Sequence, residues 1–212
     1  MKKLFLIAIL LLSVWILIDL FRPIKRDIHK FDSKKRAQHE ISMWRSYYEK
    51  KPLKLFWQLA SSLRDQYDLP FWQSFPLAYQ ASKAAFVFKQ GTDRSSYIEA
   101  LPYLQHFFSD IQAFSIQSIP VEEVSRLELG WWIIRRETDK YGPKDWELIL
   151  QKQAALMYEM QPQATKKYAQ FRVEAMRKRD ESGLGISEST WIELEEILFK
   201  SWNSLEAALM KN

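Results

Sequence analysis

The first 21 residues contain an apolar run that a water-soluble domain could not leave on its surface. Residues 4–21 read LFLIAILLLSVWILIDLF. A helix of this length rises about 1.5 Å per residue and would extend roughly 27 Å, close to the thickness of the hydrocarbon core of a bilayer. Asp19 lies near the end of the run, where its carboxylate can reach the membrane–water interface, and Trp15 and Phe21 are suited to interfacial contacts. The run therefore predicts a single membrane-spanning helix.

A cleaved signal peptide is the alternative to a permanent anchor, because it shares the short basic start and the apolar run. Cleavage requires small residues before the cut. No Ala, Gly or Ser lies between Val14 and Asp32. We therefore predict an uncleaved anchor over residues 1–30, with a basic flank after the apolar run.

The charges on both sides of the apolar run bear on which side of the membrane the rest of the chain occupies. Four basic residues follow the run and two precede it, namely Arg22, Lys25, Arg26 and Lys30 after it and Lys2 and Lys3 before it. The positive-inside rule then favours a cytoplasmic domain. A short basic tail also begins many bacterial anchors that export their C-terminal domain, so both orientations stay open.

The distribution of charge excludes a nucleic-acid-binding domain. Residues 1–36 hold nine Lys or Arg and three Asp, whereas the rest of the chain holds 22 basic and 23 acidic residues. A protein that binds nucleic acid carries its positive charge on the folded domain, where it neutralises phosphates. Here the charge accompanies the apolar run. The expected partner of residues 4–21 and their basic flank is the lipid bilayer, with lipid headgroups beside the basic side chains.

After the anchor, apolar residues recur at three- and four-residue spacing, and Gly and Pro are few, which is typical of an all-α protein. We predict a single helical domain of about seven or eight helices over residues 31–212. Asp32, Asp93 and Ser187 are expected N-caps, and Pro102 is expected to kink the helix in which it lies. The expected helices cover residues 32–50, 52–68, about 76–91, 93–111, 118–137, 143–161 and 164–180, and the last begins at 187.

The chain lacks the motifs of several kinds of enzyme. It has no Cys, which excludes disulfides, thiolate metal sites and thiol nucleophiles. Its three histidines, His29, His39 and His106, do not form the Glu-x-x-His pairs of di-metal helical bundles. No glycine-rich phosphate loop and no GxSxG elbow is present. We therefore expect no metal and no cofactor.

Two segments concentrate aromatic and charged residues: HEISMWRSYYEK, residues 39–50, and RLELGWWIIRRE, residues 126–137. In each segment a Glu precedes a Trp by four residues and shares its helix face. A carboxylate or guanidinium on a Trp-bearing face loses water and needs a partner. The segments could form the floor of a ligand pocket or, as we favour from sequence, interhelical polar contacts in a filled core. The candidate ligand-binding residues are Glu40, Trp44, Arg45, Glu128, Trp132 and Arg135.

A third charged segment, FRVEAMRKRDE at residues 171–181, places Arg172, Glu174, Arg177 and Asp180 at helical spacing. Such a pattern is typical of a solvated helix face. An anion site or a docking surface is the alternative.

With its apolar N-terminus and the segments MWRSYYEK, LELGWWIIRRE and EAMRKRD, the chain resembles a family of uncharacterised bacterial membrane-anchored helical proteins. The likeness covers most of the chain. It implies a bacterial architecture but no known activity and no catalytic residue.

The composition favours a membrane-tethered, non-enzymatic helical module that binds a partner protein or an apolar ligand. The alternative is an all-α enzyme or ligand-binding protein with a cleft between helices that is lined by Glu, Arg and Trp. Convergence of Glu40, Arg45, Glu128 and Arg135 on a pocket of a few hundred Å³ would favour the alternative. Pairing of these side chains in a filled core would favour interhelical contacts.

Overall fold

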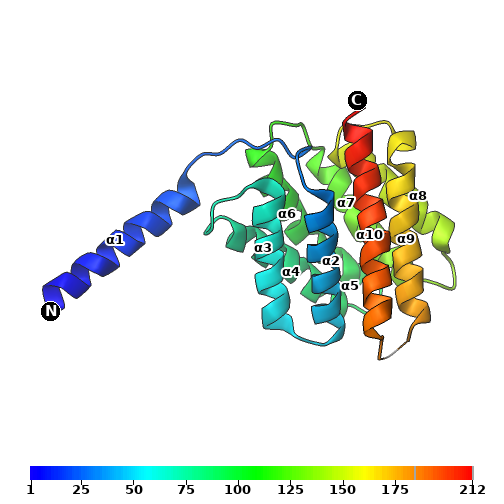
Figure 1. Ribbon diagram of the computed structural model, residues 1–212, viewed down its shortest axis with the longest axis horizontal. Helices are drawn as coiled ribbons and strands as arrows, with labels where there is room; N and C mark the ends of the chain where they lie inside the picture. The colour runs from blue at the N-terminus through cyan, green and yellow to red at the C-terminus, as the bar shows by residue number, and fades with distance from the viewer. Residues whose placement is uncertain (184, 212) are drawn as a thin grey trace.

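The computed structural model describes residues 1–183 and 185–211, and 77% of the chain is helical, with no β-strand in the described part. This confirms the all-α prediction. An isolated N-terminal helix, α1, precedes a domain with eight helices of 14 residues or more, in agreement with the expected seven or eight (Figure 1). The elements are α1 (Lys2–Phe21), α2 (Ser33–Tyr48), α3 (Pro52–Tyr67), α4 (Ser74–Gln90), α5 (Arg94–Ile98), α6 (Leu101–Phe114), α7 (Val121–Arg136), α8 (Pro143–Met157), the 3₁₀ helix η1 (Pro162–Thr165), α9 (Lys166–Glu181) and α10 (Glu188–Leu209).

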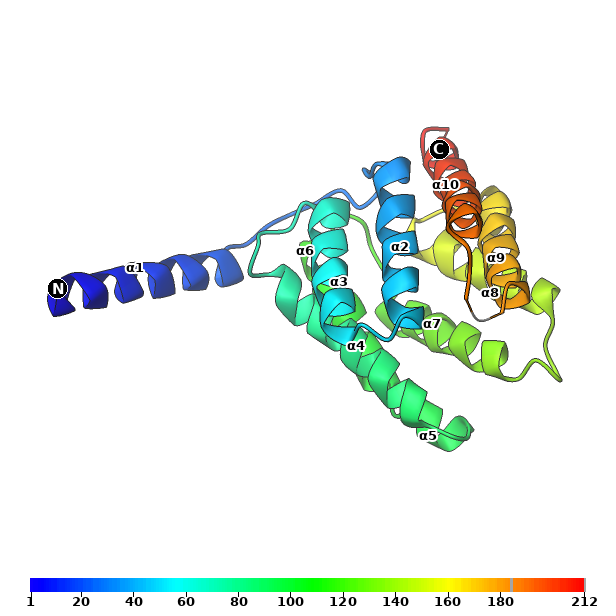
Figure 2. The same cartoon turned by 60° about the horizontal axis from the view of Figure 1, so that its bottom comes forward.

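The N-terminal helix α1 extends away from the domain, and none of its residues is buried (Figures 1 and 2). Among the described helices it alone is long and apolar enough to cross a membrane. Eighteen consecutive apolar-rich residues on an exposed helix are costly to leave in water, because moving each apolar side chain out of water lowers the free energy. The structure thus provides a helix that can span a bilayer beside a separate folded domain.

Helix starts follow the capping chemistry of the sequence. The Asp32 carboxylate accepts the Lys35 backbone N–H at 2.9 Å at the start of α2, and the Ser187 hydroxyl accepts that of Thr190 at 3.1 Å at the start of α10. Each bond satisfies a backbone donor that the helix itself leaves free. The N-caps predicted at these two positions are confirmed.

The prediction of one continuous helix over residues 93–111, kinked at Pro102, was wrong, although its predicted N-cap was correct. Asp93 does cap a helix, but this helix, α5, ends at Ile98, and α6 begins at Leu101 with Pro102 in its first turn. A proline in the first turn of a helix costs no hydrogen bond, because the N–H that it lacks has no partner there. The proline therefore starts a new helix and does not bend a continuous one.

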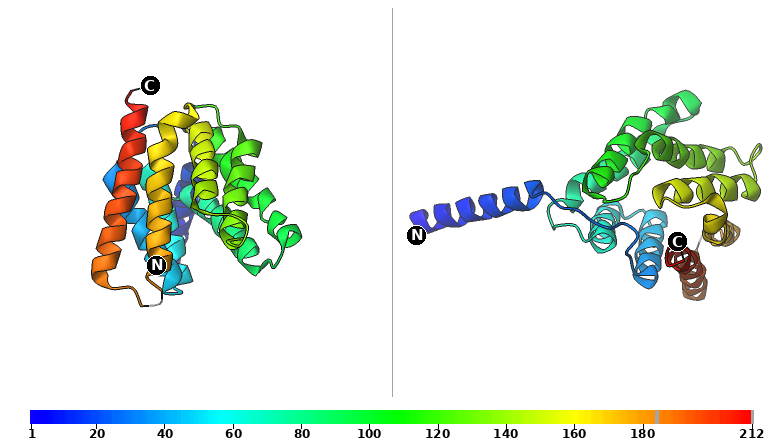
Figure 3. Two further views of the ribbon diagram at one scale, coloured as in Figure 1. Left: turned by 90° about the vertical axis from the view of Figure 1, so that its right-hand side faces the viewer. Right: turned by 90° about the horizontal axis from the view of Figure 1, so that it is seen from above.

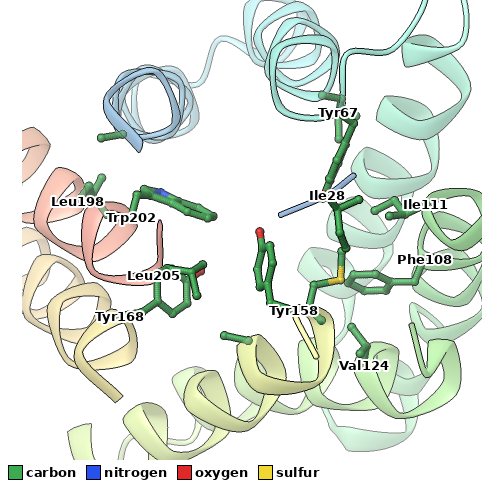
Figure 4. Close-up of a cluster of buried hydrophobic side chains, with 14 of the residues drawn as sticks. Ile28, Tyr67, Phe108, Ile111, Val124, Tyr158, Tyr168, Leu198, Trp202 and Leu205 are labelled. Atoms are coloured by element: carbon green, nitrogen blue, oxygen red, sulfur yellow. The ribbon is translucent and has the colours of Figure 1, made fainter. Parts of the chain in front are cut away.

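The eight long helices of the domain form a closed ring. Each packs against the next in the order α2, α3, α4, α6, α7, α8, α9 and α10, and α10 packs against α2 to close the ring. The view from above shows this order, with the N-terminal and C-terminal helices of the domain side by side (Figure 3). Large side chains from the surrounding helices point toward the middle, including Tyr158 and Trp202 (Figure 4). The arrangement turns the apolar faces of the helices inward, where they form one large core cluster and two smaller ones.

The segment between α1 and α2 is part of the folded domain, which corrects the predicted boundary at residue 31. Ile28 is fully buried in the largest core cluster. The Arg26 backbone N–H donates to the Phe114 carbonyl at 2.7 Å, and the Arg26 carbonyl accepts the Ile116 N–H at 2.9 Å. Because these backbone groups pair with the chain beyond α6, the domain begins at about Ile24 and the linker to α1 is short.

Part of the basic flank, for which the sequence predicts lipid headgroups as partners, also contacts the domain. The Arg26 guanidinium donates to the Asp68 carbonyl at 2.8 Å and lies 3.2 Å from the Asp68 carboxylate. The Lys25 ammonium donates to the Ala113 carbonyl at 3.0 Å. These two cations therefore help to fix the linker on the ends of α3 and α6.

Candidate functional site

A cavity of about 330 Å³ lies inside the ring, and each of the eight long helices of the domain contributes to its lining. Most of the wall is apolar or aromatic, with side chains such as Leu63, Phe108 and Met157. Cavities of this size and composition, with a few polar groups, are typical of small-molecule sites. The polar and ionisable side chains that line it are Arg36, Glu40, Ser62, Gln66, Glu128, Gln153 and Arg172, together with the tyrosines 67, 158 and 168 and the tryptophans 44, 132 and 202.

One wall of the cavity is built around an ion pair between α2 and α9. Both carboxylate oxygens of Glu40 bind the Arg172 guanidinium, at 2.6 and 2.8 Å, and one of them also accepts the indole N–H of Trp202 at 2.8 Å. The two charged side chains are only 9% and 14% exposed. Bidentate pairing and a third donor compensate for the water that both charges lose. Arg172 and Trp202 therefore occupy most of the hydrogen-bond acceptor sites of the Glu40 carboxylate.

Arg36, one turn before Glu40 on α2, is the cation of the cavity that has no acidic partner in the described chain. One of its terminal nitrogens donates to the Ser62 hydroxyl at 3.0 Å, and its guanidinium lies over the Trp202 ring, 4.4 Å from the ring centre. Its Nε is buried and makes no hydrogen bond within the described residues. A cation in such surroundings favours a bound anion, because the charge has lost water without gaining a counter-ion.

Glu128 supplies a second carboxylate on the far side of the ring, from α7. It accepts the Trp132 indole N–H at 2.8 Å and the amide N–H of Gln153, so both of its protein donors are neutral. Burial raises the pKa of the Glu128 carboxyl, and the hydrogen bond from Gln153 and the charge of Arg172 oppose the shift without cancelling it. A carboxyl that favours its protonated form inside a cavity can act as a hydrogen-bond donor or exchange a proton with a bound molecule.

The tyrosines of the wall are held neutral. Burial raises the pKa of Tyr67, Tyr158 and Tyr168, and in each case the charge of Arg36 opposes the rise. These hydroxyls are therefore hydrogen-bond donors and acceptors at any ordinary pH.

Four of the six candidate residues chosen from sequence line the cavity: Glu40, Trp44, Glu128 and Trp132. The structure places the other two, Arg45 and Arg135, elsewhere. Arg45 forms ion pairs with Glu188 at 2.6 Å and with Glu49 at 3.1 Å at the outer surface.

Arg135 pairs with Asp180 at 2.8 Å and covers the Trp146 ring. Both arginines therefore join neighbouring helices without reaching the cavity, and the proposed network of Glu40, Arg45, Glu128 and Arg135 does not form.

The cations that do reach the cavity are Arg36 and Arg172. Arg172 lies in the segment 171–181, for which a solvated face and an anion site were the sequence-based alternatives, and its guanidinium is mostly buried. Arg177, in the same segment, is exposed and pairs with Glu181 at 3.3 Å. The segment thus has one cation that lines the cavity, Arg172, and a second buried cation, Arg179, that lies over the Tyr48 ring. A sequence signal for both inward arginines exists, since Arg36 precedes Glu40 by four residues and Tyr168 precedes Arg172 by four.

In the part of the chain that the structure describes, no group of three or more acidic or histidine side chains is arranged to hold a metal ion. Besides the Glu40–Arg172 pair, the lining of the cavity offers the guanidinium of Arg36, the carboxyl of Glu128 and neutral donors and acceptors. These groups can bind an anion, and Glu128 can transfer a proton.

Comparisons of the chain with protein-family models, curated proteins and solved structures found no match. The resemblance to bacterial membrane-anchored helical proteins stays a prediction, and the function must be argued from the geometry of the cavity.

Proposed function

We propose that this protein is a membrane-tethered binding protein that holds one small molecule in the central cavity of its helical ring. The ligand has an apolar or aromatic body and one anionic group. The observation that carries the proposal is the cavity itself, which is lined by all eight long helices and combines aromatic walls with the guanidinium nitrogens Nε of Arg36 and Arg172, which have no hydrogen-bond partner among the described residues. The anchor α1 keeps the domain at the membrane, where apolar molecules concentrate.

The size of the cavity distinguishes this proposal from the interhelical contacts favoured on sequence alone. Protein interiors are close-packed and contain few voids larger than a water molecule. A space of about 330 Å³ is much larger than such a void and is large enough for a small organic molecule. A bound molecule would pack against the apolar and aromatic lining, so a space of this volume fits a binding site better than a filled core.

The charges of the lining support an anionic group on the ligand. Glu40 is committed to Arg172 and Trp202, whereas Arg36 has no acidic partner among the described residues and lies beside the hydroxyl of Ser62. A carboxylate at Arg36 would accept hydrogen bonds from the guanidinium and gain a charge-assisted interaction inside the protein. Burial raises the pKa of the Glu128 carboxyl, which lowers the cost of protonating it beside such a ligand.

An enzyme is the second candidate, and Glu128 is the observation that favours it. A carboxyl with a raised pKa that faces a cavity is a typical general acid or base. Binding and catalysis would share the cavity and differ in the effect of Glu128→Gln. If Glu128 transfers a proton in a reaction, the wild-type protein would convert the ligand, whereas Glu128→Gln would bind the ligand and leave it unchanged.

The proposal is tested by native mass spectrometry of the full chain released from detergent micelles. The wild-type protein is expected to carry an additional mass that disappears on denaturation. Ala154 and Ala81 line the cavity from α8 and α4, so Ala154→Leu and Ala81→Leu should fill it and abolish the additional mass. Ala207→Leu, on the exposed face of α10, is the matched control and should keep it.

The same variants make the outcome decisive. If the wild type and the cavity-filling variants carry identical adducts, the adducts lie outside the cavity and the proposal is wrong. If the wild type carries none and Ala154→Leu raises the melting temperature without affecting any binding, the cavity is a packing defect.

The anionic group is tested with probes that share one body: 2-naphthoate, 2-naphthamide and 2-naphthylmethylammonium. Isothermal titration of the detergent-solubilised protein should show the tightest binding for the carboxylate. Arg36→Gln should weaken binding of 2-naphthoate by about tenfold to a hundredfold, the loss of one charge-assisted hydrogen bond worth about 1.5–3 kcal/mol, and should leave 2-naphthamide almost unaffected. Equal affinity for all three probes would leave the cavity as a site but remove the anionic ligand from the proposal.

A further inference from the structure

A continuous series of aromatic contacts connects α1 with the domain. The Trp15 ring of α1 meets the edge of Trp72, which lies in the turn between α3 and α4, with ring centres 5.9 Å apart. Phe71 and Phe75 contact Trp72 at 5.1 and 5.7 Å, and Trp57 of α3 contacts Phe75 at 5.2 Å. We call Trp57, Phe71, Trp72 and Phe75 the aromatic patch.

Two members of the aromatic patch, Trp57 and Phe71, are exposed although they are large and apolar, and Trp72 and Phe75 are partly buried. Trp57 is 54% exposed and Phe71 is 39% exposed. Leu53, one turn before Trp57 on the same face of α3, is 80% exposed. The turn between α3 and α4 is on the side of the domain from which α1 extends (Figure 1). An apolar surface of this kind beside a membrane anchor needs a partner that covers it.

Hydrogen bonds fix the depth of the aromatic patch relative to α1. The Asp19 carboxylate accepts the Trp72 backbone N–H at 2.6 Å, and the Gln73 side chain donates to the Arg22 carbonyl at 2.9 Å. The turn between α3 and α4 is therefore attached to the last turn of α1. It moves with α1, and its height above a membrane follows from that of Asp19.

Asp19 must lie at the membrane–water interface if α1 spans the bilayer, because a carboxylate in the hydrocarbon core is costly. Trp15 precedes Asp19 by four residues, so it lies about 6 Å deeper along the helix. Trp72 contacts both residues. Its indole ring therefore lies in the layer of headgroups and upper acyl chains, the layer in which Trp is enriched in membrane proteins.

We propose that the aromatic patch inserts into the interfacial layer of the bilayer that α1 spans, so that the domain lies on the membrane surface with α3 and the α3–α4 turn against the lipid. This inference depends on the membrane-spanning role of α1 and not on a ligand in the central cavity. Lipid is the expected partner because the hydrogen bonds to Asp19 and Arg22 hold the patch beside the anchor. The cationic Arg64, whose guanidinium lies 4.9 Å from the Phe71 ring centre, fits anionic headgroups at the rim.

The chain contains no Cys, so a single introduced Cys gives a unique labelling position. Spin labels at Trp57→Cys and Phe71→Cys report on the patch. Labels at Ile192→Cys on α10 and Leu148→Cys on α8, which are 55% and 52% exposed, serve as controls of similar exposure away from the patch. A label at Leu12→Cys, within α1, reports whether the anchor spans the bilayer.

The full-length protein is reconstituted in vesicles of phosphatidylcholine with one part in five of phosphatidylglycerol. Collision of each label with oxygen, which concentrates in lipid, is compared with collision with a water-soluble nickel complex. The ratio of oxygen collisions to nickel collisions should be several-fold higher for labels at residues 57 and 71 than for labels at residues 192 and 148. The label at residue 12 should be the most lipid-exposed.

Three other outcomes would contradict the inference, and the collision data distinguish them. If the label at residue 12 is in lipid but those at 57 and 71 are as water-exposed as the controls, the domain stands off the membrane. If 57 and 71 are shielded from both reagents and their spectra broaden through spin–spin contact, the patch binds a second copy of the chain. If the label at residue 12 is itself in water, α1 does not span the bilayer and the inference fails at its premise, whereas ligand binding in the cavity is unaffected.

Discussion

Replacing Glu40 by Gln is the perturbation whose consequence follows most directly from the geometry. The variant keeps the size of the side chain but removes the charge that balances Arg172, which would remain only 14% exposed. Removing one partner of a buried ion pair costs about 3–5 kcal/mol, because the remaining charge is left without compensation. The Gln carbonyl can still accept one hydrogen bond from Arg172 or Trp202, so we expect the lower end, about 3 kcal/mol.

A loss of this size is a large share of the free energy of unfolding, which is about 5–15 kcal/mol for most domains. For a domain of this length each 1 kcal/mol lowers the melting temperature by about 2–4 °C, so Glu40→Gln should lower it by roughly 6–12 °C. Urea unfolding of the full chain in detergent, followed by far-ultraviolet circular dichroism, gives the free energy directly. Glu49→Gln, which removes an exposed partner of Arg45, is the control and should leave stability unchanged.

The double variant Glu40→Gln with Arg172→Met tests the electrostatic cause. It removes both charges and should recover most of the lost stability, because the penalty lies in the unpaired guanidinium and not in the missing contact. A loss of less than about 1 kcal/mol for Glu40→Gln would refute the reasoning, since it would mean that water or a neighbouring group already compensates Arg172.

Two further substitutions test other parts of the structure. Burial raises the pKa of Glu128 above its ordinary value of 4.5, so between the unfolded and folded pKa values the folded protein binds more protons and stability falls as pH rises. Glu128→Gln should therefore melt higher than wild type at pH 8, with a smaller difference at pH 4, and a pH-independent difference would contradict the assignment. Ile28→Ala should lower the free energy of unfolding by about 2–5 kcal/mol, because Ile28 is fully buried in the core. No loss in urea unfolding of this variant would mean that the linker is not part of the domain.

Local chemistry in the sequence was sufficient to predict the helices but not their arrangement. Asp32 and Ser187 act within three residues of themselves, so their capping bonds could be inferred from the chain alone. Closure of the ring by α10 on α2 depends on contacts between segments more than a hundred residues apart, for which a single sequence holds no signal. The cavity arises from this closure, so its existence could not be predicted either.

The contacts of the linker between α1 and α2 likewise depend on a segment that is distant in sequence. The sequence places Lys25 and Arg26 in a basic stretch next to an apolar helix, where lipid headgroups are the expected partners. In the structure the Arg26 backbone pairs with residues 114 and 116, and its side chain binds Asp68. These interactions became visible only when the end of α6 was placed beside the linker.

The selection of cavity residues succeeded at Glu40 and Trp44 and failed at the neighbouring Arg45. Arg36, Glu40 and Trp44 are spaced by four residues and all line the cavity. Arg45 follows Trp44 directly, but one residue along a helix is a rotation of about 100°, and this places it on the outer surface beside Glu188. The spacing of four that identified Glu40 with Trp44 would also have identified Arg36.

The two Glu-x-x-x-Trp pairs of α2 and α7 are locally the same, yet their carboxylates have opposite electrostatic surroundings. Glu40 is bound by Arg172, 132 residues away, and its charge is compensated. Glu128 has only the neutral donors Trp132 and Gln153, and burial raises its pKa. Removing the charge of Glu40 should therefore destabilise the protein, whereas removing that of Glu128 should stabilise it at alkaline pH. Of the two carboxylates, only Glu128 is free of an ion pair and accepts hydrogen bonds from neutral donors, and for this reason the chemistry of a bound molecule is expected to depend on Glu128 while the shape of its site depends on Glu40.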